Sequence, residues 1–188
     1  VHLRHEPPRL TSLQRAKQVL GLRHPAKTAP RAFARRVEPD PEAVRENRVL
    51  LLTGQDDPRP RAAYRILRTR LLHKMHASGW TSVAITSPGA GEGKSLTTLN
   101  LALSLAHARA GEVFLIDLDL RSPSVFRYLG ARPPFDLTRF FQGEGEPVDV
   151  FASVGPDDLA IAGSAEPTEL ASELLASTRL DELLAAIP

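Results

Sequence analysis

The chain has 188 residues, a net charge of +2, 42% hydrophobic and 24% charged residues, and no cysteine. Its length fits one domain with an extension, and its composition permits a packed core. Without cysteine there is no disulfide, iron–sulfur cluster or cysteine nucleophile. No apolar run reaches the roughly 18–20 residues of a membrane-spanning helix. We therefore expect a globular domain rather than a disulfide miniprotein or a membrane span.

Basic residues are concentrated at the start of the chain. Residues 1–37 carry nine basic side chains against one acidic one, a net charge of +8, which leaves −6 for residues 38–188. Prolines interrupt this region, so the only order expected in it is a short helix over residues 11–20. We expect residues 1–50 to form a basic, largely disordered arm. It either contacts phosphates or an anionic membrane surface or is a solvated tail, and we expect no specific nucleic-acid partner.

An amphipathic helix is predicted after the turn-rich residues 54–60. Its apolar positions are four residues apart, at Ala63, Leu67, Leu71 and Met75. The arginines of the same stretch lie along another face, at Arg61, Arg65 and Arg68. This spacing predicts a helix of about four turns, closed by Ser78-Gly79.

The next elements follow a strand–loop–helix–strand order. Residues 81–87 predict a short strand, 88–93 a loop, and 94–109 a helix that is apolar on most sides. Residues 112–118 then form a continuous apolar run, as expected of a strand covered on both faces. The intervening helix makes the two strands parallel and the connection right-handed. We expect a third strand over residues 158–162 and helices over 168–176 and 178–187.

The loop between the first strand and the helix has the composition of a phosphate-binding loop. Glycines let successive backbone N–H groups converge on a phosphate, and the following helix adds the positive end of its dipole. Lys94 can reach the β- and γ-phosphates, and the Ser95 hydroxyl is placed to coordinate Mg²⁺. Pro88 stands where the full pattern has its first glycine. The alternative is an ordinary glycine-rich turn with a solvated lysine. The candidate binding residues are Gly89, Ala90, Gly91, Glu92, Gly93, Lys94, Ser95 and Leu96.

Two aspartates, Asp117 and Asp119, follow the second strand. Ligands collect at the carboxyl ends of parallel strands, so these side chains are expected beside the phosphate loop. A carboxylate there can hold Mg²⁺ and orient or deprotonate an attacking hydroxyl. We expect Lys94, Asp117 and Asp119 to be catalytic, with Ser95 and Asp117 at the metal. The alternative is that both aspartates cap the following helix.

These motifs together resemble the bacterial tyrosine kinases of capsule and exopolysaccharide synthesis. The likeness covers roughly residues 50–188 and keeps the family's motif order. The motifs are Ala63-Tyr-Arg-Ile-Leu-Arg-Thr69, Thr86-Ser-Pro-Gly-Ala-Gly-Glu-Gly-Lys-Ser95, Asn100-Leu-Ala102, Leu115-Ile-Asp-Leu-Asp-Leu-Arg121 and Glu173-Leu-Leu-Ala-Ser177. Related partition and cell-division ATPases have a signature lysine where this chain has Gly89, which disfavours their mechanism.

The resemblance implies an ATP- and Mg²⁺-dependent autokinase that produces phosphotyrosine. It also implies a cytoplasmic protein that is peripheral at the inner membrane through a polysaccharide co-polymerase, with which it controls polymer length and export. The alternative is a nucleotide-dependent switch module without kinase activity. Self-association through the helix that carries Tyr64 and Arg68 is a further expectation, although Ala62 stands where the family usually has a glutamate.

The expected fold is α/β: a three-layer P-loop NTPase fold with a mostly parallel sheet over residues 51–188. The family continues from its final helix into a strand that ends in an aspartate and then into a tyrosine-rich tail. We therefore expect the domain to be truncated on its C-terminal side, with an unpaired sheet edge, and residues 1–188 alone to be inactive.

Overall fold

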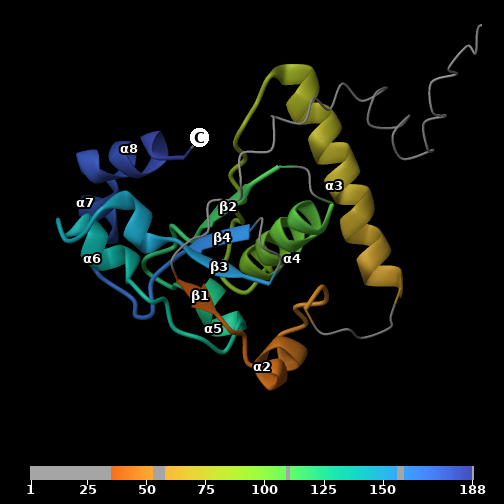
Figure 1. Cartoon of the computed structure of the whole chain (residues 1–188), viewed down its shortest axis with the longest axis horizontal. Helices are drawn as coiled ribbons and strands as arrows, with labels where there is room; N and C mark the ends of the chain where they lie inside the picture. Colours follow the sequence, from red (N-terminus) through yellow and green to blue (C-terminus); the bar gives the residue numbers. More distant parts are fainter. Residues whose placement is uncertain (1–34, 53–57, 109–110, 156–158, 188) are drawn as a thin grey trace, which may run out of the picture.

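The computed structural model describes residues 35–52, 58–108, 111–155 and 159–187. The helix predicted over residues 11–20 lies outside this part of the chain. The described elements are, in chain order, β1 (Arg36–Val37), α2 (Pro41–Glu46), α3 (Pro58–Ser78), α4 (Lys94–His107), β2 (Val113–Ile116), α5 (Val125–Tyr128), α6 (Leu137–Phe141), the 3₁₀ helix η1 (Pro147–Val150), β3 (Ala152–Val154), β4 (Leu159–Ala162), α7 (Ala171–Leu175) and α8 (Thr178–Ala185). Figure 1 shows their arrangement around a central sheet.

The described strands form one sheet in the order β1-β3-β4-β2. β2 runs parallel to β4 with Val113 opposite Leu159 and Ile116 opposite Ala162. β1 is parallel to β3, and β3 is antiparallel to β4. The expected strands over 112–118 and 158–162 are thus confirmed as β2 and β4, while β1 and β3 carried no signal that we recognised. The register brings the carboxyl ends of β2 and β4 to the same edge, where the Asp117 amide donates to the Ala162 carbonyl at 2.9 Å.

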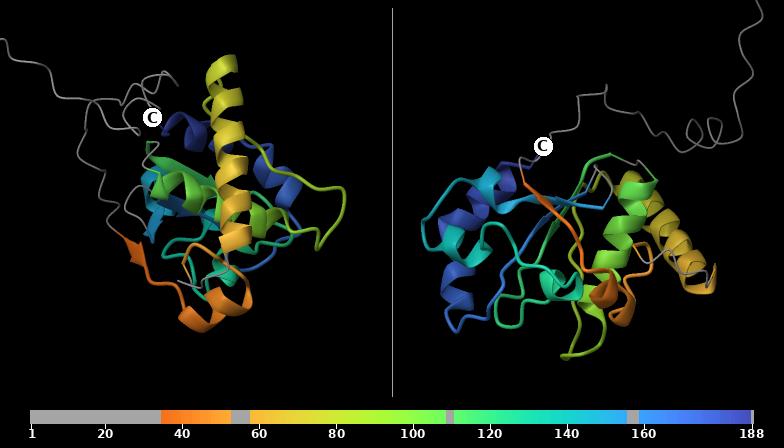
Figure 2. Two further views of the ribbon diagram at one scale, coloured as in Figure 1. Left: turned by 90° about the vertical axis from the view of Figure 1, so that its right-hand side faces the viewer. Right: turned by 60° about the horizontal axis from the view of Figure 1, so that its bottom comes forward.

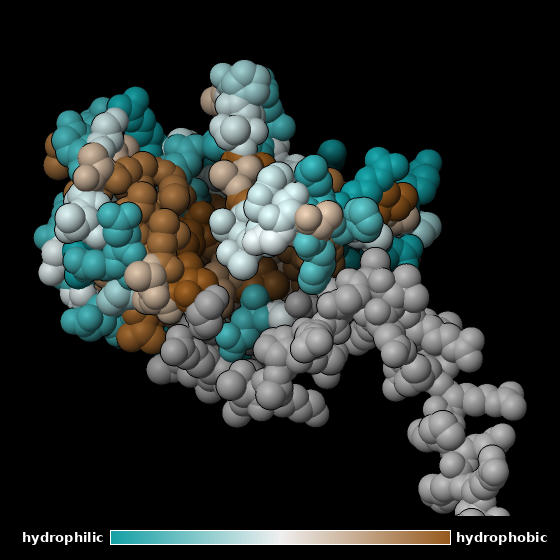
Figure 3. Space-filling model, turned by 90° about the horizontal axis from the view of Figure 1, so that it is seen from above, coloured by the Kyte–Doolittle hydropathy of each residue, from teal (hydrophilic) through white to brown (hydrophobic). Residues whose placement is uncertain are grey.

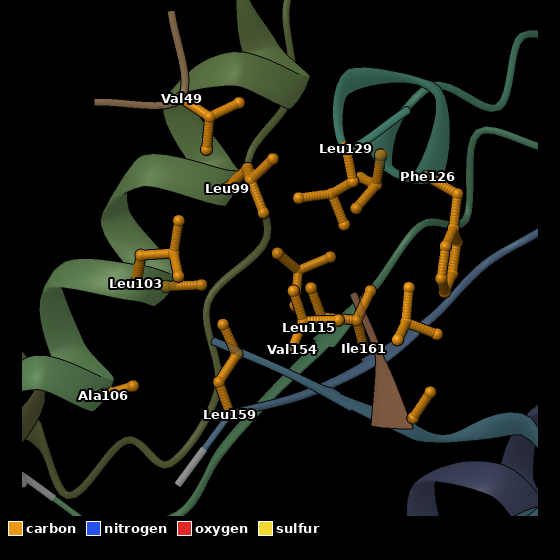
Figure 4. Packing of buried hydrophobic residues seen from close by; sticks show 14 of the residues in the cluster. Val49, Leu99, Leu103, Ala106, Leu115, Phe126, Leu129, Val154, Leu159 and Ile161 are labelled. Carbon is orange, nitrogen blue, oxygen red and sulfur yellow. The ribbon is translucent and has the colours of Figure 1, made fainter. Parts of the chain in front are cut away.

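Helices cover both faces of the sheet and make three layers (Figures 1 and 2). Side chains alternate between the faces of a strand. In β4, Leu159 and Ile161 accordingly join the core under α4 and α5, whereas Ala160 and Ala162 join the core under α6 to α8. In the first core, Leu99 and Leu103 of α4 point at the sheet (Figure 4). The three-layer α/β fold expected from the sequence is confirmed.

The face of α3 that packs against the rest of the protein differs in part from the apolar face that the leucine spacing predicted. It packs against α4, yet Leu67 is 40% exposed and no α3 side chain is fully buried. Arg68 instead points inward and donates to the Ser104 carbonyl at 2.8 Å, and Arg61 donates to the Leu50 carbonyl at 2.9 Å. The expectation for the two faces was thus wrong for Ala63 and Leu67, which are exposed, and for Arg61 and Arg68, which reach carbonyl acceptors. Leu71 and Met75 are half-buried and Arg65 is exposed, as expected.

Residues 81–87 are extended but form no strand pairing, contrary to the prediction. The segment is largely exposed, with Trp80 at 55% and Val83 at 51%. Within the described residues, β2 ends the sheet with β4 as its only partner, and residues 81–87 do not pair with its free edge. β2 is therefore an edge strand of the described sheet. Figure 3 shows apolar residues gathered on the face seen from above in Figure 1.

The folded body begins earlier than residue 51. β1 pairs with β3, and Val44 of α2 and Val49 are buried in the first core. α2 is capped by Asp40, whose carboxylate accepts the Glu42 amide at 2.8 Å, with Pro41 in the first turn. The expectation of a disordered arm up to residue 50 is thus wrong for residues 35–50, because their valines have a place in the core.

The remaining helices follow the predictions closely. α4 spans 14 residues and is mostly buried, as its apolar sequence indicated, and α7 and α8 lie within the two predicted C-terminal ranges. Among the described residues, no helix combines the length and the apolar character that crossing a bilayer requires.

Candidate phosphate-binding site

The glycine-rich loop turns sharply before α4, and its glycines make this turn possible. Gly91 and Gly93 have φ values of +77° and +85°, which residues with a Cβ rarely adopt. Ser87 Oγ donates to the Gly89 carbonyl at 2.8 Å, and the Thr97 amide donates to the Gly93 carbonyl at 2.8 Å. The loop thus ends on the first turn of α4, where the free N–H groups of a helix can receive an anion.

Lys94 is ion-paired with Asp119 at 2.5 Å between Nζ and Oδ2. The hydrogen bond to Asp119 raises the pKa of Lys94 above its usual value, against a smaller opposing effect of desolvation. The side chains of both residues are about a third exposed or less, at 30% and 27%. The lysine is therefore charged at neutral pH, and an incoming phosphate competes with Asp119 for it.

Asp117 is nearly buried and organises the turn that follows β2. Its Oδ2 accepts the amides of Ser124 at 2.9 Å and Val125 at 3.0 Å, and its Oδ1 accepts the Asp119 amide at 3.2 Å. Through these contacts the Asp117 carboxylate caps the first amides of α5. This is the alternative role, helix capping, that the sequence analysis left open. A carboxylate has about four acceptor positions, so one remains for a metal ion or its water.

Ser124, which sequence reasoning missed, joins the two candidate metal ligands. Its hydroxyl donates to Ser95 Oγ at 2.7 Å, and its amide donates to Asp117. Its position in the sequence could have indicated this contact. Ser124 follows Asp117 by seven residues, a separation at which a turn after the strand can return the chain to the aspartate. The turn thereby brings Ser95 from α4 and Asp117 from β2 to one point.

The structure brings together the four residues expected to carry chemistry: Lys94, Ser95, Asp117 and Asp119. Gly89 to Glu92 are exposed beside them, and Leu96 is half-buried in the first turn of α4. Among the described residues, no cluster of three or more His, Asp or Glu side chains could enclose a metal on its own. Mg²⁺ commonly uses one or two protein ligands together with substrate phosphates and water. The donor set of one hydroxyl and one carboxylate next to a phosphate loop fits that pattern.

The fold and the loop define a class: a P-loop NTPase-like α/β domain. The chain is 45% identical over 62 residues to the tyrosine-protein kinase YwqD of Bacillus subtilis (strain 168), a match covering 33% of this chain and 26% of that relative. The BceF tyrosine kinase domain superposes with a TM-score of 0.63 and 25% identity over 92% of this chain and 69% of that one. The chimerical protein CapA2B2 superposes with a TM-score of 0.58 and 21% identity over 74% and 61%, and shows likeness of fold.

No protein-family model matches the chain. The match in sequence and the match in structure nevertheless point to the same group of proteins. The resemblance expected from the motifs is confirmed: the chain is related to bacterial tyrosine kinases. It spans about a quarter of the curated relative that it matches.

Proposed function

We propose that the chain is the nucleotide-binding part of a bacterial protein-tyrosine kinase that uses ATP and Mg²⁺. One observation carries the proposal: Lys94 and Ser95 begin α4 directly beside Asp119 and Asp117, at the carboxyl edge of the sheet. A plain phosphate-binding turn needs no carboxylates. Two carboxylates next to the loop are what metal-assisted phosphoryl transfer requires.

Each residue has a distinct proposed role. Lys94 leaves Asp119 and binds the β- and γ-phosphates. Ser95 and Asp117 hold Mg²⁺, which neutralises charge on the phosphates when bound. Asp119, released from the lysine, is then free to accept the proton of the attacking hydroxyl.

In the proposed reaction, the tyrosine oxygen forms a bond to the γ-phosphorus. The bond between this phosphorus and the oxygen that bridges to the β-phosphate breaks, ADP leaves, and the phenolic proton passes to a carboxylate. Most of the catalysis in such transfers comes from positioning and charge stabilisation. The rigid link from Ser95 through Ser124 to Asp117 supports that kind of positioning.

The wider role follows from the family resemblance. We propose that the protein acts at the cytoplasmic side of the inner membrane through a polysaccharide co-polymerase partner and regulates exopolysaccharide or capsule polymerisation and export. The alternative is an ATP-dependent switch without kinase activity. The Lys94–Asp119 pair is compatible with it, because nucleotide binding rearranges this pair whether or not phosphate is transferred.

The test is to measure ATP·Mg²⁺ binding by titration calorimetry and phosphotyrosine formation by immunoblot in the full-length protein. We expect both in the wild type; in Lys94→Ala we expect binding weakened about 5- to 30-fold and no phosphotyrosine. Binding without phosphotyrosine would support the switch module, and absence of binding would overturn both functions.

A further inference from the structure

α3 is a strongly basic helix in a region of the chain that is otherwise acidic. Its 21 residues include six basic side chains and no acidic one. Residues 38–188 have a net charge of −6, so those outside α3 carry −12. Figures 1 and 2 show α3 along one side of the molecule, with α4 between it and the sheet. The outward face of α3 therefore presents positive charge to whatever approaches this side.

Most of the basic side chains of α3 point outward. Arg61 and Arg68 reach backbone carbonyls inside the protein. The other four are exposed: Arg59, Arg65, Arg70 and Lys74. In the part of the chain that the structure describes, the side chains of Arg65 and Arg70 have no hydrogen bond or ion pair. These two guanidinium groups are thus available to an anion from outside.

Large apolar side chains lie among these charges. Ile66, Arg70 and Lys74 are four residues apart and form one stripe along the helix, and Ile66 is 55% exposed. Trp80 follows the helix and is also 55% exposed. The Lys74 ammonium lies 5.7 Å from the centroid of its ring, which places the indole beside the stripe. The outward face of α3 is therefore basic and apolar at once.

An open hollow of about 510 Å³ separates the two available guanidinium groups. Its lining consists of Ala62, Arg65, Ile66, Thr69 and Arg70. The Thr69 hydroxyl donates to the Arg65 carbonyl at 2.9 Å, so it is satisfied within the helix and needs no outside partner. A phosphate group in this hollow would have an arginine on each side, the side chain that suits phosphate geometry, and Ile66 next to it.

We infer that the outward face of α3 docks on an anionic bilayer surface, with lipid phosphates at Arg65 and Arg70 and with Ile66 and Trp80 in the headgroup region. Helices with basic residues and exposed aromatic or aliphatic side chains lie in such an interface, and an indole ring is favoured there. A purely acidic protein surface would satisfy the arginines but leave Ile66 and Trp80 in water. The negative charge of the rest of residues 38–188 turns α3 toward the lipid.

The experiment uses Trp80, which is the single tryptophan of the chain, so its fluorescence reports this face in the unmodified protein. The 188-residue chain is titrated, without nucleotide, with vesicles of phosphatidylcholine alone or mixed with phosphatidylglycerol, and brominated acyl chains detect insertion. We expect a blue shift and quenching with the anionic vesicles only. Both should be lost between about 0.15 M and about 1 M salt, as the Debye length falls from about 8 Å to about 3 Å.

A pair of double variants tests the arginines. Arg65→Ala with Arg70→Ala removes both guanidinium groups and keeps helix propensity. It should weaken partition into anionic vesicles about 10- to 30-fold, at up to about fivefold for each charge. Arg127→Ala with Arg132→Ala removes the same charge from exposed positions on α5 and the loop after it, and should weaken partition less than about threefold. Circular dichroism spectra should be the same in all three proteins.

Three results would overturn the inference. Sedimentation with anionic vesicles without a change in Trp80 emission would show that the basic N-terminal residues, rather than α3, bind the lipid. Equal weakening by the two double variants would show an effect of net charge alone. A blue shift that grows with protein concentration without vesicles would show that a second copy of the chain covers this face. The inference does not depend on the kinase function, because lipid binding in a preparation that binds no nucleotide would overturn only the latter.

Discussion

The ion pair between Lys94 and Asp119 predicts how much nucleotide affinity the loop lysine contributes. A charged hydrogen bond to phosphate stabilises by about 1.5–3 kcal/mol. Before it forms, Lys94 gives up Asp119, and a partly exposed pair of this kind, with side chains 30% and 27% exposed, contributes about 0.2–1 kcal/mol. The net contribution of Lys94 is then roughly 1–2 kcal/mol, or about 5- to 30-fold in the dissociation constant.

The assay is titration calorimetry of an ATP analogue with wild type, Lys94→Ala and Asp119→Asn, each with Mg²⁺ and with chelator. Lys94→Ala should weaken binding by the amount above in both conditions. Asp119→Asn removes the competitor and should tighten Mg²⁺-free binding about two- to fivefold, the equivalent of the lost pair. Lys74→Ala, at an exposed lysine of α3, is the control and should leave affinity unchanged.

Two results would refute this reasoning. Equal affinities for wild type and Lys94→Ala would show that Lys94 does not bind phosphate, and the loop would be an ordinary turn. An unchanged or weaker Mg²⁺-free affinity in Asp119→Asn would show that Asp119 does not compete for the lysine.

Further predictions concern catalysis, stability and association. In the full-length protein, Asp117→Asn should leave nucleotide affinity within about tenfold but reduce phosphotransfer by ~10² or more, the scale expected when the metal and the reacting groups lose their positioning; unchanged autophosphorylation would restrict Asp117 to capping α5. Asn100 is fully buried and bonds to the Leu50 amide at 2.8 Å and the Arg48 carbonyl at 3.2 Å. Asn100→Ala should therefore lower the free energy of unfolding by about 1–3 kcal/mol, because two partly buried backbone groups lose their partners, and urea denaturation measures this. The raised pKa of Lys94 means that its ion pair stabilises the fold fully below about pH 10 and that this contribution is lost as the pH rises through the folded-state pKa; thermal unfolding at alkaline pH should therefore show a steeper loss in wild type than in Lys94→Ala. The unpaired edge of β2 and the exposed Val83 predict that the chain associates and that Val83→Lys shifts size-exclusion profiles toward the monomer; a monodisperse wild-type chain would contradict this.

Local sequence alone was enough to predict the elements that carry the candidate site. The continuous apolar run of β2 predicts a strand that is buried on both faces. The apolar sequence of α4 likewise predicts a helix that packs against the sheet. Glycines at positions 91 and 93 permit the observed turn, since both take positive φ, which residues with a Cβ rarely adopt. The position of Lys94 and Ser95 at the start of α4 follows from these local constraints.

Features that depend on a distant partner required the tertiary structure. The leucine spacing of α3 could not reveal that carbonyls of Leu50 and Ser104 would draw its arginines inward. Residues 81–87 have strand-like residues, but pairing depends on where the segment lies relative to another strand, and in the described structure it does not pair with the free edge of β2.

The same distinction applies within the site. The sequence placed Asp117 and Asp119 beside the phosphate loop, because parallel strands bring their carboxyl ends to one edge. Which aspartate would pair with Lys94, and which would accept the amides of the following turn, depended on how that turn folds back. Ser124 meets Ser95 only because 29 residues of chain return to the same edge, and a contact across that separation is decided by packing of the whole sheet rather than by local propensity.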